Sequence, residues 1–161
     1  MTRKEYNKAV DDFSDQLYRF SLKQAGNQDL ANDIVQESFT RLWQKVEAIS
    51  YEKCKSYLFT TAHNYFIDII RKEKKSADPE KEKIKDDYHT TQNHDVQEIL
   101  DKALQTIPDI QKTVVLLRDY EGYSYQEIGE ITNLTEAQVK VYIFRARKNL
   151  RDYLVNIDYI V

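Results

Sequence analysis

Apolar residues near the start of the chain recur every three or four positions, which is the spacing of one face of a helix. The first such row begins at Tyr6 and ends at Phe20. Gly26 is typical of a helix stop, and Asn27 can cap a second helix whose apolar row spans residues 30–46. The pattern therefore predicts two consecutive amphipathic helices.

A loop around residues 47–53 separates these helices from a third one, which ends in the basic run RKEKK at 71–75. The apolar row of this third helix consists of Leu58, Ala62, Tyr65, Phe66, Ile69 and Ile70. The following stretch, SADPEKEKIKDDYHTTQN, is densely charged with both signs and nearly devoid of apolar residues. Such a segment buries too little surface to offset the entropy of ordering, so we expect a flexible charged linker over residues 76–94.

Helical periodicity returns at Val96 and continues to Ile107. Pro108 suits the first turn of a further helix, which runs through a dense apolar stretch toward a stop at Gly122. The chain therefore divides into an N-terminal helical domain over 1–75 and a C-terminal helical domain over 95–161.

Two capping boxes follow in the C-terminal part. Ser124 with Glu127 forms an S-x-x-E box, and Thr135 with Gln138 forms a T-x-x-Q box. Between them lies YQEIGEI, about two helical turns, followed by the turn TNL. A short helix, a tight turn and a long helix are typical of the helix-turn-helix, which binds DNA with its second helix.

The long helix separates its side chains into two faces. At 100° per residue, Val139, Ile143, Ala146 and Leu150 share a narrow face that we expect to meet the core. The opposite face mixes cations with apolar residues: Ala137, Lys140, Val141, Phe144, Arg145, Lys148 and Arg151. An ordinary basic surface helix also carries cations, but the capped helix and turn before it favour a helix that enters a major groove.

Composition agrees with a helical protein and restricts its chemistry. The 161 residues include only three glycines and two prolines, fewer than sheets joined by tight turns normally need. The net charge of −3 disfavours indiscriminate binding of nucleic acid, although a local basic patch acts over roughly 10 Å. A single cysteine, Cys54, indicates a reducing compartment. Neither a signal sequence nor a bilayer-spanning apolar run is present, so we expect a cytoplasmic protein without membrane insertion.

Catalytic and metal chemistry have little support in the sequence. His63, His89 and His94 lack metal-ligand spacing, Cys54 has no motif partner, and no glycine-rich phosphate loop is present. We therefore expect no enzymatic activity, no metal and no cofactor.

Three segments resemble one family in the correct order. SYQEIGEITNLTEAQVKVYIFRARKNL resembles the C-terminal DNA-binding region of the extracytoplasmic-function (ECF) sigma factors of bacterial RNA polymerase, which belong to the sigma-70 family. DLANDIVQESFTRLWQK resembles their polymerase-binding helix, and SYLFTTAHNYFIDIIRKEKK resembles the helix that melts and reads the minus-10 element. The resemblance implies an all-α fold. A region-2 domain of three to four helices and a four-helix region-4 helix-turn-helix domain would be joined by the linker.

The resemblance also implies a role for particular residues. Core RNA polymerase would be bound by an acidic and amide-bearing surface, namely Asp33, Gln36 and Glu37. Melted minus-10 DNA would meet His63, Asn64, Arg71, Lys72, Lys74 and Lys75, with the loop 47–55 lining a pocket for a flipped base. The minus-35 duplex would meet Gln138, Lys140, Val141, Phe144, Arg145 and Lys148.

Promoter preference is not carried by the resemblance, because the chain departs from the family pattern at the positions that matter. Tyr57 and His63 stand where members often have Trp and Arg. Gln138 and Val141 are likewise uncommon, and they could read an adenine edge and a thymine methyl group respectively.

The partners implied by the resemblance are core RNA polymerase, promoter DNA and an anti-sigma factor. An alternative from the residues alone is a stand-alone helix-turn-helix regulator whose N-terminal half dimerises or senses a ligand. The two hypotheses differ in whether core polymerase with this protein starts transcription at a specific promoter.

Overall fold

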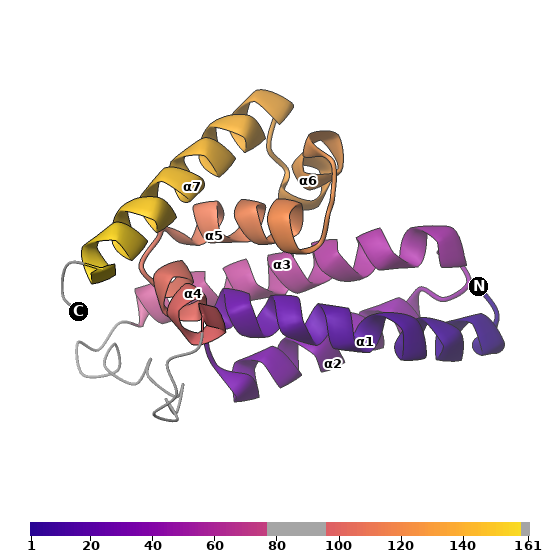
Figure 1. Cartoon of the computed structure of the whole chain (residues 1–161). Helices are drawn as coiled ribbons and strands as arrows, with labels where there is room; N and C mark the ends of the chain where they lie inside the picture. Colours follow the sequence, from indigo (N-terminus) through magenta and orange to yellow (C-terminus); the bar gives the residue numbers. More distant parts are fainter. Residues whose placement is uncertain (77–95, 159–161) are drawn as a thin grey trace. The chain divides into compact units, whose positions relative to one another are not determined.

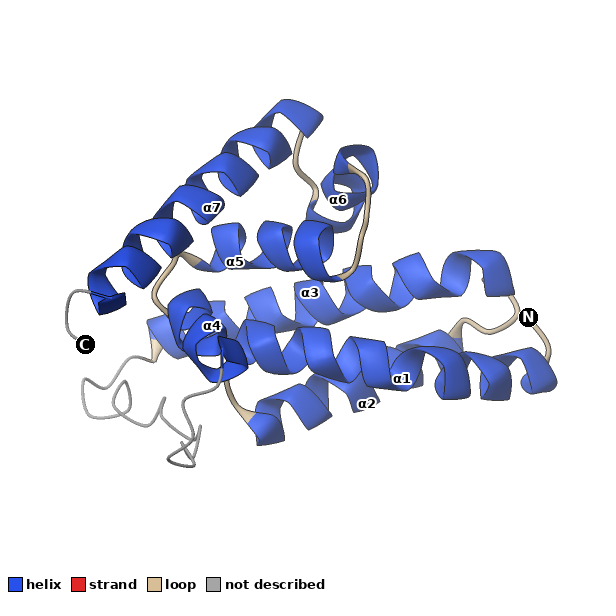
Figure 2. Ribbon diagram, in the orientation of Figure 1, coloured by secondary structure: helices blue, strands red, loops and turns tan. Residues whose placement is uncertain are grey.

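The computed structural model describes residues 1–76 and 96–158, and every regular element in these residues is a helix (Figure 2). The predicted all-α fold is therefore confirmed for this part of the chain. Residues cluster into two compact units, Met1–Asp87 and Tyr88–Val161. The predicted linker over 76–94 lies, apart from Ser76, outside the described residues.

Three long helices form the first unit: α1 (Arg3–Ala25), α2 (Gln28–Gln44) and α3 (Tyr51–Lys75) (Figure 1). Each of them packs against the other two. The predicted boundary between α1 and α2 is confirmed. Gly26 ends α1 with a φ of 71°, in the left-handed region that glycine tolerates best, and Asn27 Oδ1 accepts a hydrogen bond of 2.9 Å from a backbone N–H of α2.

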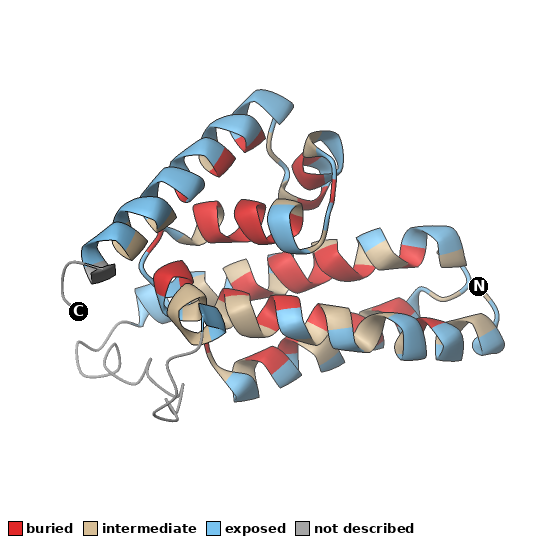
Figure 3. Cartoon of the chain, viewed as in Figure 1, coloured by how far each residue is buried: buried red, intermediate tan, exposed pale blue. Residues whose placement is uncertain are grey.

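Residues of the predicted apolar rows form much of the core of this unit, together with residues outside those rows such as Phe59 (Figure 3). The rings of Phe20 and Phe59 lie 5.2 Å apart between centroids and join α1 to α3. The fully buried side chains around them include Leu17, Ile34, Leu42 and Leu58. Because each helix contributes to one shared apolar centre, the polar faces of α2 and α3 are left for other contacts.

The third helix begins earlier than expected. Residues 51–55 are helical, so the predicted loop at 47–55 is confined to the residues before Tyr51. Tertiary contacts explain the extension: the Tyr51 ring lies 6.0 Å from that of Phe13, and its hydroxyl donates a hydrogen bond to Asp12. These contacts to α1 favour an ordered first turn that the local sequence does not reveal.

The second unit contains α4 (Val96–Gln105), α5 (Asp109–Val115), α6 (Tyr125–Thr132), α7 (Glu136–Asp158) and a short π-helix η2 (Leu116–Tyr120). The long helix α7 packs against α4, α5 and α6 (Figure 1). These four α-helices agree with the predicted four-helix arrangement, and α6 and α7 are the predicted helix-turn-helix.

Both predicted capping boxes are confirmed. Ser124 Oγ accepts from Glu127 N at 3.1 Å, and Ser124 N donates to Glu127 Oε1 at 3.0 Å. Thr135 and Gln138 repeat the arrangement at 3.1 and 2.9 Å. Each box thereby satisfies the N–H of its cap residue and one orphan N–H of the first helical turn without help from any other element.

The turn between α6 and α7 is tight. Asn133 adopts a φ of 59°, a left-handed conformation that asparagine tolerates. Gly129 of α6 faces the returning chain so closely that a Cβ at this position would lie 2.7 Å from the carbonyl oxygen of Leu134. The turn can approach α6 only because residue 129 has no side chain.

A single helix was expected to run from Pro108 toward Gly122, but it changes character at Leu116. There the backbone forms a π turn, in which Glu121 N donates to Leu116 O at 3.1 Å. Leu116 and Leu117 are fully buried, and Gly122 then turns the chain with a φ of 76°. A π turn contains about one residue more than an α-helical turn, so the side chains that follow it point in a different direction.

Candidate nucleic-acid and polymerase interfaces

The buried face of α7 fixes which of its side chains reach solvent. Val139, Ile143 and Ala146 are buried as predicted, whereas Leu150 is half-buried. On the opposite side Phe144 is 71% exposed and Val141 is 44% exposed. Two large apolar side chains at this exposure leave apolar surface in water, which is the kind of surface a partner covers.

Cations border these apolar groups. Arg145 and Lys148 are exposed beside Val141 and Phe144. Lys140 is also exposed, but its Nζ lies 3.7 Å from Glu136 Oε1 and 5.6 Å from the centroid of the Tyr125 ring. A shallow open hollow on this face is lined by Ala137, Gln138, Val141, Tyr142 and Arg145. The structure thus brings together the six residues predicted for the minus-35 duplex on one solvent-facing surface of α7.

Besides lying on this surface, Gln138 caps the N-terminus of α7. One lone pair of its Oε1 accepts the capping bond from Thr135 N, which holds the oxygen toward the cap and makes the amide NH₂ the more available group for a ligand. A base edge would therefore meet a donor at this position.

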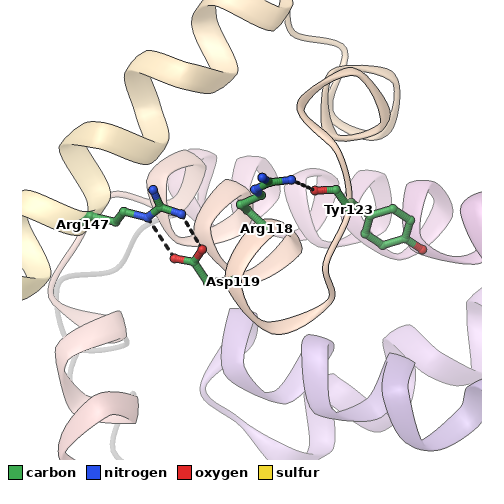
Figure 4. Close-up of polar contacts among 4 residues, drawn as sticks. All are labelled: Arg118, Asp119, Tyr123 and Arg147. Carbon is green, nitrogen blue, oxygen red and sulfur yellow. Dashed lines mark hydrogen bonds and ion pairs between the residues drawn. The ribbon is translucent and has the colours of Figure 1, made fainter.

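Two side-chain pairs attach the flanks of α7 to the rest of the unit. Arg147 and Asp119 form a bidentate ion pair, with Nη2–Oδ1 at 2.6 Å and Nε–Oδ2 at 3.1 Å (Figure 4). Asn149 Nδ2 donates to Oε1 of the buried Gln111 at 2.8 Å. The sequence did not reveal the ion pair, because its residues are 28 positions apart and the π turn places Asp119.

The predicted polymerase-binding residues lie on the solvent-facing side of α2. Asp33 and Gln36 are exposed. Glu37 is half-exposed and pairs with Arg41 one turn later, with Oε1–Nε at 2.9 Å. Arg41 also lies over the Tyr65 ring of α3, 5.4 Å from its centroid. This surface is therefore less acidic than the sequence suggests, because one of its carboxylates is already paired.

The α3 helix presents most of the residues predicted for minus-10 DNA. Asn64 is exposed, and the terminal cations Arg71, Lys72, Lys74 and Lys75 are all exposed. They extend from the middle of α3 to its C-terminal end, where positive charge also complements the helix dipole.

His63 does not belong to that exposed surface. It is 4% exposed, and its Nδ1 lies 3.2 Å from Nε2 of the buried Gln24 on α1. Burial lowers the pKa of His63 to about 4, so the imidazole is neutral at neutral pH. The expectation that His63 contacts DNA is therefore corrected, because α3 turns this position toward α1.

Within residues 1–76 and 96–158, we found no group of three or more His, Cys, Asp or Glu side chains placed to hold a metal ion. Over the same residues, no helix is long and apolar enough to cross a membrane.

A helix-turn-helix whose second helix exposes cations and apolar side chains together has the arrangement that DNA-binding proteins place in the major groove. Comparison with known families specifies the class further. The sequence of the family described as "Sigma-70 region 2" matches residues 9–76, and that of the family described as "Sigma-70, region 4" matches residues 97–150.

Relatives agree with both matches. The chain is 32% identical over 164 residues to the RNA polymerase sigma factor SigV of Bacillus subtilis, covering 98% of this chain and 99% of that one. It is 29% identical to the ECF RNA polymerase sigma factor SigM of the same organism, covering 86% and 88%. The chain therefore belongs to the sigma-70 family and, within it, to the ECF RNA polymerase sigma factors. These are DNA-binding transcription initiation factors, and the alternative of a stand-alone regulator is not favoured because region 2 is matched as well.

Solved structures show the same fold. The sigma factor RpoE, in complex with the anti-sigma factor NepR from Bartonella quintana, superimposes with a TM-score of 0.77 at 23% identity, covering 94% of this chain and 97% of that one. CnrH, in complex with the cytosolic domain of CnrY, gives a TM-score of 0.73 at 17% identity, covering 96% and 90%.

Proposed function

We propose that the exposed face of α7 enters the major groove of the minus-35 promoter element and reads its sequence there. The observation that carries this proposal is the exposure of Phe144 and Val141 among cations, directly opposite the buried row of the same helix. Arg145 would pair with a base edge and Lys148 with a phosphate, while Val141 and Phe144 would cover thymine methyl groups or sugars.

The second proposed DNA contact is on α3. Exposed Asn64 would bind an unstacked base of the melted minus-10 strand, and the terminal cations would follow its backbone. The burial of His63 supports a contact surface that begins at Asn64 and excludes its neighbour. The residues that line a base pocket would come from the segment before Tyr51 as well as from the first turns of α3.

The proposed polymerase contact is on α2. Asp33, Gln36 and Glu37 point away from the apolar core of the first unit and offer carboxylate and amide oxygens to a cationic partner. The pair formed by Glu37 and Arg41 would open or rearrange on binding, because a second cation competes for the same carboxylate.

Domain boundaries and the remaining partner are part of the same proposal. We infer a region-2 domain over 1–75 and a region-4 domain over 95–161, which would act in the cytoplasm. Solved relatives in complex with anti-sigma factors support an anti-sigma factor as a partner of this protein too. Two DNA contacts on one chain would give avidity and fix the spacing between the promoter elements.

In vitro transcription across fragmented genomic DNA, with bacterial core RNA polymerase and the full chain, tests this function. We expect transcripts that start downstream of a shared pair of elements and that are absent with core polymerase alone. Specific DNA binding without any supported initiation would contradict the proposed role and favour a stand-alone regulator.

A further inference from the structure

The two flanks of α7 are held by different partners. On one flank the guanidinium of Arg147 binds Asp119 of η2 through two hydrogen bonds of 2.6 and 3.1 Å. On the other flank Asn149 Nδ2 donates to Gln111 Oε1 of α5 at 2.8 Å. Figure 4 shows the first pair side by side with Arg118.

Helix geometry places these two attachments on opposite sides of the axis. Arg147 and Asn149 are separated by about 200° around the helix, so each lies about 70–90° from the buried row on its own side. The exposed row with Val141, Phe144 and Arg145 is on the remaining side. The buried row anchors α7 from beneath, and the flanking pairs resist its rotation about its own axis.

The π-helix η2 carries the residue that pairs with Arg147. Arg118 and Asp119 are adjacent residues of η2, and they bind the two helices of the helix-turn-helix separately. Arg118 Nη1 donates to Tyr123 O at 2.9 Å, and its guanidinium lies 4.6 Å from the Tyr125 ring centroid at the start of α6. Asp119 binds α7 through Arg147. Hydrogen bonding to Asp119 raises the pKa of Arg147, because the carboxylate stabilises the charged guanidinium.

We propose that the pairs Asp119–Arg147 and Gln111–Asn149 form a rotational clamp that determines which face of α7 the promoter meets. Asp119, Arg147, Gln111 and Asn149 are then positioning residues for minus-35 recognition, an inference that rests on the proposed function of α7. A rotation of about 20° would move side-chain tips on a helix of this diameter by about 2 Å. Base-edge hydrogen bonds tolerate only a few tenths of an ångström, so such a rotation would reduce sequence discrimination.

If the pairs act as a clamp, their loss should lower sequence discrimination while changing stability little. A contact that only stabilised the fold would not have this combination of effects. Both side chains of the ion pair are partly exposed, 38% for Asp119 and 46% for Arg147, so solvent screening limits even this bidentate pair to a modest contribution to stability. Asp119→Ala should therefore change the thermal unfolding temperature little. The substitution also releases the Arg147 cation near the DNA, so affinity for non-promoter DNA should stay equal or rise while discrimination falls.

The test uses the full chain assembled with core RNA polymerase. Transcription is compared between a promoter identified as above and the same promoter with one minus-35 base pair changed. Unfolding temperature and binding to a non-promoter duplex are measured on the full chain alone. For Asp119→Ala we expect the ratio of matched to mismatched transcription to fall by at least about three-fold, part of the penalty that one base pair usually carries. Glu130→Ala, which removes the same charge from another exposed position of the unit, should leave the ratio unchanged.

Two further variants keep the inference testable if Asp119→Ala fails to fold. Arg147→Lys keeps the charge but cannot form the bidentate pair, so it should also lower the ratio. Exchange of the two charges, Asp119→Arg with Arg147→Asp, should recover part of it. Equal losses on matched and mismatched promoters, or an unchanged ratio, would overturn the clamp. If the unaltered protein itself does not discriminate between the two promoters, it is the proposed reading by α7 that fails.

Discussion

Thr135 and Gln138 cap the first turn of α7 reciprocally. Gln138, which belongs to the proposed DNA surface, therefore also stabilises the fold. Gln138 Oε1 accepts from Thr135 N at 2.9 Å, and Thr135 Oγ1 accepts from Gln138 N at 3.1 Å. Capping and the proposed DNA contact would therefore use different atoms of one amide. The two uses can be separated by substitution.

Gln138→Glu should preserve the cap while weakening DNA binding. A carboxylate accepts the bond from Thr135 and suits a helix N-terminus, so the unfolding temperature should not fall. The lost NH₂ donor and the added negative charge should lower affinity for every duplex. Gln138→Ala is the comparison, because it removes the cap at a cost of about 0.3–1.5 kcal/mol. An unfolding temperature equally reduced in both variants would show that the cap does not account for the stability of this turn.

Val141 should recognise the methyl group of a thymine. Replacing that thymine by deoxyuridine removes one methyl group, which is worth about 0.8 kcal/mol when fully buried, or about four-fold in affinity. We expect scanning replacement in the minus-35 element to reveal one sensitive position, and Val141→Ala to abolish the sensitivity there. Val155→Ala, at a similarly exposed valine near the end of α7, should leave it intact. A sensitivity that persists in Val141→Ala would assign the methyl contact to another residue.

Arg145 and Lys148 should differ in what they contribute. Lys148→Ala should weaken binding to all sequences and reduce the slope of log affinity against log salt by roughly one unit, as expected for a lost phosphate contact. Arg145→Ala should cost about 1–3 kcal/mol at one base pair if it pairs with guanine. Titrations on matched and mismatched duplexes at several salt concentrations measure both. Equal losses on the two duplexes would argue against base readout by Arg145.

The α2 surface should bind core polymerase through its acidic and amide groups. Glu37→Lys combined with Gln36→Ala should lower affinity in a pull-down with core enzyme, because it inverts the charge offered to a cationic partner. The loss of the partly exposed pair with Arg41 should change stability by no more than about 1 kcal/mol. Asp15→Lys on α1 serves as a control of similar charge change, and unchanged binding by the double variant would remove α2 from the proposed interface.

His63 should make the first unit sensitive to acid. Its pKa is about 4 in the folded protein and about 6.5 when unfolded, so the folded state binds fewer protons between these values. Stability is therefore complete above pH 6.5 and falls as the pH drops toward 4, by up to about 3 kcal/mol. Denaturation of the full chain at pH 7 and pH 5 measures the loss. His63→Gln should show a smaller difference between these two pH values, and an identical difference would mean that another group titrates.

Local signals in the sequence were sufficient to predict the ends of several helices. The boxes at Ser124 and Thr135, the cap at Asn27 and the stop at Gly26 depend on neighbouring residues alone, and the structure confirms all of them. The face of α7 was predictable for the same reason, since the helical period assigns each side chain a direction.

Features that depend on tertiary contacts were not predictable. The first turn of α3 is ordered by contacts of Tyr51 with α1, and no local signal in the sequence marks the π turn at Leu116. The family resemblance implied a DNA contact for His63, but resemblance does not fix the direction of a side chain, and His63 points about 100° away from its exposed neighbour Asn64. The partner of Arg147 is remote in the sequence and could not be inferred from charge alone.

The alternation of buried and exposed positions along α7 has a consequence for how such a protein changes over generations. Val139, Ile143 and Ala146 carry the packing, whereas Val141, Phe144 and Arg145 are exposed. Substitutions at exposed positions usually alter folding free energy by less than about 0.5 kcal/mol. If the exposed residues recognise the promoter, they can be substituted one at a time while every intermediate variant still folds. The set of promoters that the protein recognises could therefore change gradually.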